Sequence, residues 1–264
     1  MKKLGFCFLI YDIINHEELW NQFFKHVDPA KYGIYIHYKT NTPLKFFEKH
    51  KLDHCIPTNY ADVTLIHAHN ILCKAAYDDG CDKIISLSQA CIPLKSFHYV
   101  YDFLTRDDYG HFNMAPPAAC FPRCNELLKF YDRSHIQKSS NWFILNRTIC
   151  RTVISEPLIQ EHYGSIISPE EHFFISTVYK YGLQDQIIAT QNIAAGATTF
   201  TNWQGMSYPF PSKKELKNYS EISDEEILYL LASKSLFGRK FNRECMGSLC
   251  NPTYLKFITS SLVK

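Results

Sequence analysis

The amino-terminal residues predict a β-strand, an α-helix and a second β-strand in close succession. Leu4 to Tyr11 is a continuous apolar run, which is typical of a strand that is covered on both faces. Glu17 to His26 carries its apolar residues on one helical face, and Tyr32 to Tyr38 is a second apolar run. This order predicts an α/β fold with a mostly parallel sheet, whose ligands bind beyond the carboxyl ends of the strands. We therefore expect Asp12 and His37, at the ends of these two strands, to line a nucleotide site.

The rest of the chain continues with further strands and helices. Phe112 to Lys138 is irregular and rich in proline and arginine, so we expect a loop over a site. Gln204 to Ser220 is a polar connection that contains three lysines. The other expected elements are helices at Asp62 to Tyr77, Ser96 to Leu104 and Asp224 to Ser233, the last capped by Ser223, strands at Lys83 to Leu87 and Ala197 to Trp203, and a strand or turn that passes into a helix at Trp142 to Ile154.

The composition gives no sign of a nucleic-acid or membrane partner. The 28 basic and 26 acidic side chains leave a net charge of +2. No segment approaches the roughly 20 apolar residues that span a bilayer, and the first apolar run lacks a small-residue cleavage site. A length of 264 residues is within reach of one large α/β unit, so we expect a single domain over residues 1–264. Because an export signal is lacking and the cysteines read as reduced thiols, we expect a cytoplasmic protein.

The ten cysteines are scattered, and several lie in apolar runs where a reduced thiol behaves as a small hydrophobe. Cys120 and Cys124, or His67 and His69, have side chains that bind metals, but neither pair has the Cys-x-x-Cys spacing of a zinc site. The pattern therefore favours structural cysteines.

The segment from Ile167 to Gly182 predicts a helix with two carboxylates in its first turn. Ser168 is a candidate N-cap and Pro169 suits the first helical position. Glu170 and Glu171 follow at the end of the helix where the macrodipole favours ionised carboxylates. Glu171 is thus a candidate general base, while the alternative is a capping box in which it only contacts the Ser168 backbone.

The segment from Leu236 to Phe241 places two adjacent cations between two aromatic residues. If Phe237 and Phe241 lie in the core, Arg239 or Lys240 is held at a defined position near the surface. A guanidinium or ammonium held in this way suits the recognition of a phosphate. The alternative is a solvated turn.

Four other residues are candidates for contact with a sugar. Ser88 and Gln89 end an expected strand, where ligand contact and ordinary turn chemistry are both open. Trp142 and Trp203 are large aromatic residues that either stack on a sugar or belong to the core.

Seven stretches, in this order along the chain, resemble the core-2/I-branching N-acetylglucosaminyltransferase family (glycosyltransferase family 14), and most closely its plant-type branch. They extend over nearly the whole chain. The stretches are Leu9 to Phe24 with Trp20-x-x-Phe23-Phe24; Ile34-Tyr-Ile-His37; Ile85-Ser-Leu-Ser-Gln-Ala-Cys-Ile-Pro-Leu94; Ser140-Asn-Trp-Phe143 with Arg147; Pro169-Glu-Glu-His-Phe173; Thr199-Phe-Thr-Asn-Trp203; and Leu236-Phe-Gly-Arg-Lys-Phe241.

The resemblance implies a Rossmann-like, A-type glycosyltransferase fold, with a nucleotide-binding half at about 1–110 and an acceptor and catalytic half at about 111–264. It implies transfer of a sugar, N-acetylglucosamine or xylose, from a UDP-sugar to a glycan or glycoprotein hydroxyl with inversion and without a metal or other cofactor. Glu171 matches the family's catalytic base, with Glu170 beside it in the sugar pocket. Arg239 and Lys240 match the residues that hold the donor diphosphate. Lys214 and Lys217 are candidates for a further diphosphate contact.

Three features keep alternatives open. Lys39 stands where branching enzymes often have Asp, and Gln89 replaces an acidic residue common in the plant branch, so a binding protein without catalysis is the second hypothesis. Asp107 and Asp108 are adjacent, whereas many sugar transferases hold a metal with an Asp-x-Asp. The third hypothesis is a zinc hydrolase that uses His67, His69 and the cysteines.

Overall fold

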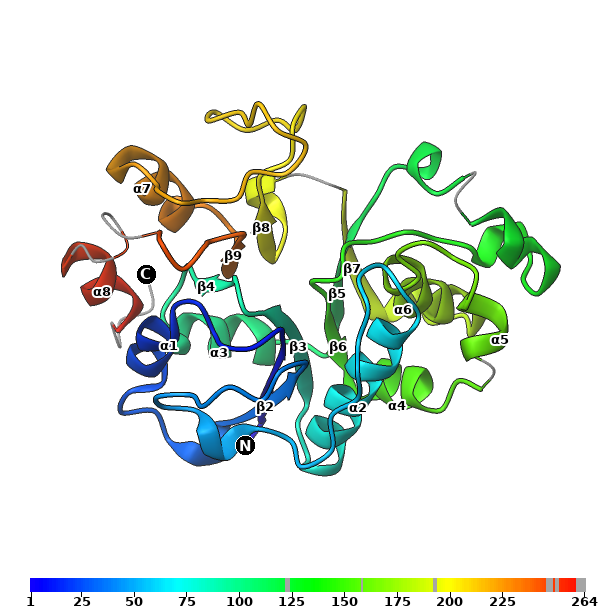
Figure 1. The fold of residues 1–264 in the computed structure, drawn as a ribbon, viewed down its shortest axis with the longest axis horizontal. Helices are drawn as coiled ribbons and strands as arrows, with labels where there is room; N and C mark the ends of the chain where they lie inside the picture. Colours follow the sequence, from blue (N-terminus) through cyan, green and yellow to red (C-terminus); the bar gives the residue numbers. More distant parts are fainter. Residues whose placement is uncertain (122–123, 158, 192–193, 246–248, 250–251, 260–264) are drawn as a thin grey trace.

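The computed structural model describes residues 1–121, 124–157, 159–191, 194–245, 249 and 252–259. A central sheet has the strand order β2-β1-β3-β6-β5-β7, and a small sheet has the order β4-β9-β8 (Figure 1). The strands are β1 (Leu4–Ile10), β2 (Tyr32–Tyr38), β3 (Lys83–Ser88), β4 (Ile92–Pro93), β5 (Gly110–Met114), β6 (Ile144–Asn146), β7 (Ile187–Gln191), β8 (Thr199–Thr201) and β9 (Phe237–Arg239).

The α-helices lie between these strands, except α8, which follows β9. They are α1 (Glu17–Phe24), α2 (Thr64–Asp78), α3 (Phe97–Thr105), α4 (Arg147–Ile154), α5 (Ile159–Tyr163), α6 (Glu170–Lys180), α7 (Asp224–Ala232) and α8 (Pro252–Ile258). In the central sheet β6 runs antiparallel to β3 and β5, while the β1–β2, β1–β3 and β5–β7 pairs are parallel. The predicted α/β fold with a mostly parallel central sheet is confirmed.

Both faces of the central sheet are covered, which explains the continuous apolar run of β1. Phe6 and Phe8 point into an aromatic cluster with Trp20 of α1 and Phe97 of α3. Cys7, between them, points to the opposite face, where α2, α4 and α6 pack. Side chains alternate across a strand, so a strand buried on both faces needs apolar residues at every position.

The helix predicted around residues 167–182 begins later than expected, and its predicted cap is wrong. Ser168 has a backbone φ of 53° and Pro169 precedes the first helical residue, with no side-chain cap hydrogen bond. The Ser168 backbone amide donates to the Ala61 carbonyl (3.1 Å), and its own carbonyl accepts from the Glu171 amide (3.1 Å). The capping-box alternative for Glu171 is therefore wrong as well.

Two strands of the central sheet were not predicted. β5 overlaps the start of the segment expected to be irregular, and its buried polar residues His111 and Asn113 break the apolar pattern. β7 is the last strand of the sheet and is largely exposed, so it shows no alternation of apolar and polar residues. The prediction of the α7 cap is confirmed, since the Ser223 hydroxyl accepts from the Glu226 amide at 3.1 Å.

Candidate active site

The candidate site lies at the carboxyl ends of the neighbouring strands β1 and β3, where the strand order of the sheet reverses. β1 has β2 on one side and β3 on the other, so the carboxyl ends of β1 and β3 form the switch point where open α/β sheets bind ligands. Gln89 follows β3 and joins the two ends. Its side chain accepts a hydrogen bond from the Tyr11 amide, and its carbonyl accepts from the Asn15 amide at 2.9 Å.

The segment from Leu236 to Phe241 packs directly against this switch point. β9 pairs with β4, which places Gly238 opposite Ile92, and the Phe241 amide donates to the Ala90 carbonyl at 3.0 Å. Phe237 and Phe241 are both fully buried, so the condition for a fixed position of the two cations is met. These contacts hold Arg239 and Lys240 beside the turn that follows β3.

Arg239 lies in a partly buried position and stacks on an aromatic ring. Its guanidinium carbon is 4.1 Å from the centre of the Trp142 ring. Its Nε is buried and has no hydrogen-bond partner among the described residues. Burial lowers the pKa of Arg239, which Cys91 and the carboxylate of Glu171 oppose. A guanidinium that is desolvated and has a free donor is suited to bind an anion.

Lys240 adds a second positive charge at the same point. Burial and the neighbouring charge of Arg239 lower the pKa of its ammonium, and no side-chain hydrogen bond or ion pair to it is found within the described part of the chain. An anion bound between these two cations would relieve their electrostatic repulsion.

Glu171 projects from the first turn of α6. Its carboxylate forms an ion pair with Lys138 (3.1 Å between Nζ and Oε2), and its side chain is 27% exposed. Its backbone carbonyl accepts from the Ser139 amide at 2.9 Å, so the segment before β6 is fixed to the start of α6. The Glu171 carboxylate also opposes the lowering of the Arg239 pKa, so the carboxylate of α6 lies within electrostatic range of the guanidinium of β9.

Glu170 is in a different environment from its neighbour. The residue is only 6% exposed, and its Oε1 accepts from the Asn141 amide nitrogen at 3.1 Å. Burial raises the pKa of Glu170 to about 7, and the charges of Glu171 and Asp62 contribute to this shift. Its Oε2 is buried without a partner among the described residues. A substantial fraction of Glu170 is therefore protonated near neutral pH, and Glu170 is less accessible to a substrate than Glu171.

Several predicted site residues already have partners in the protein. His37 is fully buried, where its Nε2 accepts from the Ile56 amide (3.0 Å), and burial lowers its pKa to about 4. This position favours a core role over direct nucleotide contact. Lys217 pairs with Glu226 at 3.2 Å, and its ammonium lies 4.4 Å from the Tyr219 ring centre.

Two of the other predicted residues, Asp12 and Ser88, lie at the carboxyl ends of β1 and β3. Asp12 forms an ion pair with Arg243 at 2.5 Å; although desolvation opposes the change, this partner lowers the pKa of the Asp12 carboxyl. Ser88 hydrogen-bonds within its own turn, where its hydroxyl accepts from the Ala90 amide at 3.3 Å. Trp203 is partly buried beyond β8, and Lys214 is exposed.

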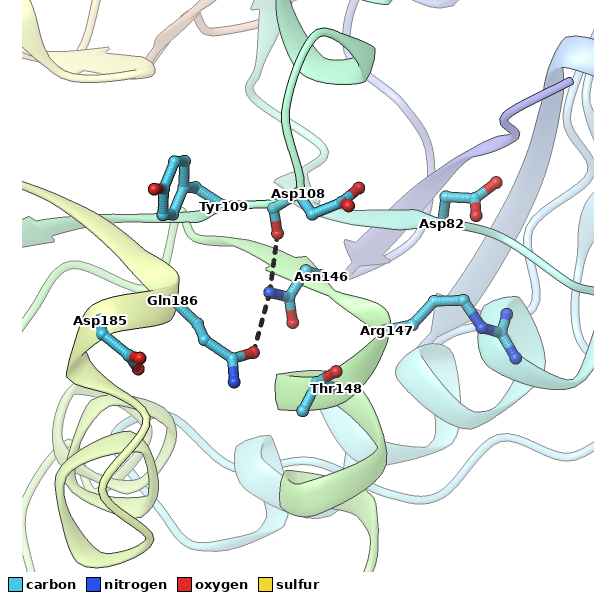
Figure 2. Close-up of a pocket in the computed structure, with 8 residues that line it drawn as sticks. All are labelled: Asp82, Asp108, Tyr109, Asn146, Arg147, Thr148, Asp185 and Gln186. Atoms are coloured by element: carbon cyan, nitrogen blue, oxygen red, sulfur yellow. Dashed lines mark hydrogen bonds between the residues drawn. The ribbon is translucent and has the colours of Figure 1, made fainter.

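Asp107 and Asp108 lie at the opposite edge of the sheet, next to the amino ends of β3 and β5. The Asp108 carboxylate pairs with Lys2 at 2.6 Å, and Asp107 is 3.6 Å from the Lys83 ammonium. An open pocket of about 570 Å³ lies at this edge. The Asn146 side chain in this pocket donates to the Asp108 carbonyl at 2.8 Å, and Figure 2 shows both residues among those that line it. These acidic residues are therefore remote from the Arg239 site.

Two residues of the site were not predicted. Lys138 ends the segment that was expected to be a loop, and nothing in the sequence links it to Glu171. Tyr11 directly follows β1, is 55% exposed, and has the Lys39 ammonium 5.6 Å from its ring centre. Its place at the carboxyl end of the first strand is a signal that sequence analysis had available.

The zinc hydrolase of the third hypothesis is not supported by the placement of the histidines. His69 packs between the rings of Phe143 and Phe174, each 5.7 Å away. Among the described residues, ligand atoms suited to a metal gather at Cys120, Cys124 and His172.

Arg239 and Lys240 thus lie beside the switch point, and the Glu171 carboxylate is within electrostatic range of Arg239. The chain belongs to the core-2/I-branching enzyme family, whose model matches residues 4–230. This confirms the family predicted from the seven stretches.

Individual relatives are distant. Glycosyltransferase BC10 of Oryza sativa subsp. japonica is 21% identical over 175 residues, which cover 61% of this chain and 43% of that protein. The chain therefore spans less than half the length of this relative. Two solved structures are similar, each at 10% identity and a TM-score of 0.45: the WbbM bifunctional glycosyltransferase (92% of this chain, 47% of that chain) and the galactosyltransferase LgtC with donor and acceptor sugar analogues (97% of both chains).

A search of the described helices finds none that combines the length and the apolar character needed to cross a membrane.

Proposed function

We propose that this glycosyltransferase moves N-acetylglucosamine or xylose from a UDP-sugar to a hydroxyl of a glycan or glycoprotein, with inversion and without a metal ion at the donor. The observation that carries the proposal is the position of Arg239, which stacks on Trp142 beside the switch point, has a buried Nε without a partner among the described residues, and is within electrostatic range of the Glu171 carboxylate. An inverting transfer needs these two groups on either side of the reacting carbon. One takes a proton from the acceptor, and the other stabilises the leaving diphosphate.

Glu171 is the proposed general base. It is accessible, whereas the neighbouring Glu170 is buried and has its pKa raised to about 7. When the acceptor hydroxyl attacks the anomeric carbon, its oxygen forms the new glycosidic bond while the bond to the UDP oxygen breaks. The acceptor proton passes to the Glu171 carboxylate.

Arg239 and Lys240 are proposed to hold the donor diphosphate. The free buried Nε of Arg239 and the ammonium of Lys240 are positioned to pair with the charge that develops on the leaving UDP. These two cations would supply the charge that a divalent cation supplies in transferases with an Asp-x-Asp site. Trp142 fixes the guanidinium plane by stacking against it.

Two further parts of the proposal concern the surroundings of the reaction. Tyr11 and Gln89, at the switch point, are proposed to lie beside the nucleotide. A cytoplasmic location is also proposed, supported by the nine cysteines of the described residues, which are all free thiols.

The test is release of UDP from a panel of UDP-N-acetylglucosamine, UDP-xylose and UDP-glucuronic acid, with and without EDTA. We expect Glu171→Gln to retain donor binding by calorimetry while turnover falls roughly 100-fold or more, the size expected for loss of a general base. Glu161→Gln, at an exposed glutamate of α5, is the matched control and should keep wild-type turnover. Full activity of Glu171→Gln would refute the assigned base.

A second candidate function is a sugar-nucleotide or carbohydrate-binding protein that has lost catalysis. The ion pair between Lys138 and Glu171 favours it, because one oxygen of the carboxylate is already engaged. Donor binding without turnover of any donor, in the presence of glycan acceptors, would support this function, and turnover above background would exclude it.

A further inference from the structure

Two cysteines and a histidine converge beside the start of α6. Cys120 follows the short turn at Pro117–Ala119, Cys124 lies four residues later, and His172 is in the first turn of α6. All three are buried, and one ligand atom from each lies within 4.8 Å of the other two. The two sulfurs are 3.4 Å apart, and the Cys120 sulfur is 3.9 Å from Nδ1 of His172.

Both separations are within about 0.4 Å of those around a tetrahedral zinc ion. With bonds of about 2.3 Å to sulfur and about 2.0 Å to nitrogen, a tetrahedral ion keeps two sulfurs about 3.8 Å apart and a sulfur and a nitrogen about 3.5 Å apart. We propose that Cys120, Cys124 and His172 bind a zinc ion that fixes the segment between β5 and β6 to the first turn of α6. This site is separate from the donor site, and the proposal does not depend on the proposed function.

Binding the ion changes the protonation of all three ligands. Both thiols lose their protons to solvent, and His172 must bind as a neutral ring whose proton is on Nε2. In the present structure Nδ1 is 2.9 Å from the Gln137 carbonyl, and ligation through Nδ1 would replace this hydrogen bond.

The position of the cluster suggests what the ion does. Gln137 is next to Lys138, which pairs with Glu171, and Glu171 is next to His172. An ion bound to His172 and to Cys120 would hold this segment close to α6. It would thereby keep the Lys138 ammonium against the Glu171 carboxylate.

A disulfide between the two cysteines is the main alternative. A disulfide needs sulfurs about 2.05 Å apart, so the thiols would have to approach further from their separation of 3.4 Å. The observed separation is closer to the roughly 3.8 Å between two sulfurs on a tetrahedral zinc ion than to the length of a disulfide bond, so a cation fits the pair better than oxidation.

The first measurement is the zinc content of the wild type, purified without added metal, by mass spectrometry of the elements. We expect about one zinc ion per chain, and a thiolate charge-transfer absorption when cobalt replaces zinc. Cys124→Ser and His172→Gln should lose most of the metal. Cys55→Ser, at a partly exposed cysteine outside the cluster, is the matched control and should retain it.

If the cluster variants do not fold, the wild type itself provides the test. After unfolding with a chelator, refolded protein should melt at a higher temperature when zinc is added than when it is withheld. A folded wild type without zinc, and with the same Tm in both conditions, would overturn the proposal. So would a native mass lower by two hydrogens that is restored by reduction, because that shows a disulfide. Neither measurement involves a sugar donor, so the result stands even if the proposed transfer activity fails.

Discussion

Replacing Glu170 by glutamine tests the environment assigned to the first turn of α6. Glu170 is 6% exposed, and its carboxyl has a pKa of about 7 against an ordinary value of 4.5. A carboxyl whose pKa is higher in the folded chain than in the unfolded chain binds more protons when folded. Stability contributed by this group is therefore present at low pH and is lost as pH rises from 4.5 through about 7.

The size of the effect follows from the two pKa values. One pKa unit corresponds to about 1.4 kcal/mol, so keeping Glu170 ionised in the folded protein costs about 3 kcal/mol well above pH 7. Glu170→Gln has nearly the shape of the protonated acid and can keep an acceptor for the Asn141 amide. The variant should therefore avoid this cost at every pH.

The assay is urea unfolding of wild type and variant at pH 5 and pH 8. We expect the variant to gain about 2 to 3 kcal/mol in free energy of unfolding relative to the wild type between these two values. Glu161→Gln, at an exposed glutamate, should show a difference from the wild type that does not change with pH. A Glu170→Gln difference that is constant with pH would refute the argument, because Glu170 would then be ionised in the folded protein.

Two further predictions concern the cations and the remote acidic residues. Arg239→Lys keeps the charge but loses the planar group that stacks on Trp142. We expect the KM for the donor to rise roughly 10-fold to 100-fold, which corresponds to the loss of one or two charge-assisted hydrogen bonds. An unchanged KM would argue against contact between Arg239 and the diphosphate. Asp108→Asn should leave donor turnover at the wild-type level both with and without EDTA, since this residue pairs with Lys2 at the far edge of the sheet. A large loss of turnover in a folded Asp108→Asn protein would reopen a metal site there.

The elements that sequence analysis predicted well are those with a strong local pattern. β1 and α1 are buried through residues that follow the period of a strand or a helix, and Trp20 of α1 packs against Phe6 and Phe8 as the pattern requires. The burial of Phe237 and Phe241 was predicted in the same way, from two aromatic residues that flank a pair of cations. Such patterns depend on residues close together in the sequence, so they can be recognised without knowing which distant residues pack against the element.

The failures share a dependence on distant contacts. The left-handed backbone of Ser168 is tied to the Ala61 carbonyl, far away in the sequence, and no local pattern signals it. β5 and β7 are strands because they pair with each other and extend the sheet, although their residues are polar or exposed. Pairing satisfies the backbone hydrogen bonds of such segments whatever their side chains are.

The candidate site shows the same division. By itself, the sequence determined the α/β fold, the family and the identity of the candidate base and cations, because apolar periodicity and the order of the motifs are properties of the sequence. Only the tertiary structure decided that Trp142 stacks on Arg239, that Lys138 pairs with Glu171, and that His37 is buried instead of facing a ligand. The electrostatic environment and the exposure of a side chain depend on residues that folding brings together. Because these residues are far apart along the chain, no local sequence pattern reveals their contacts.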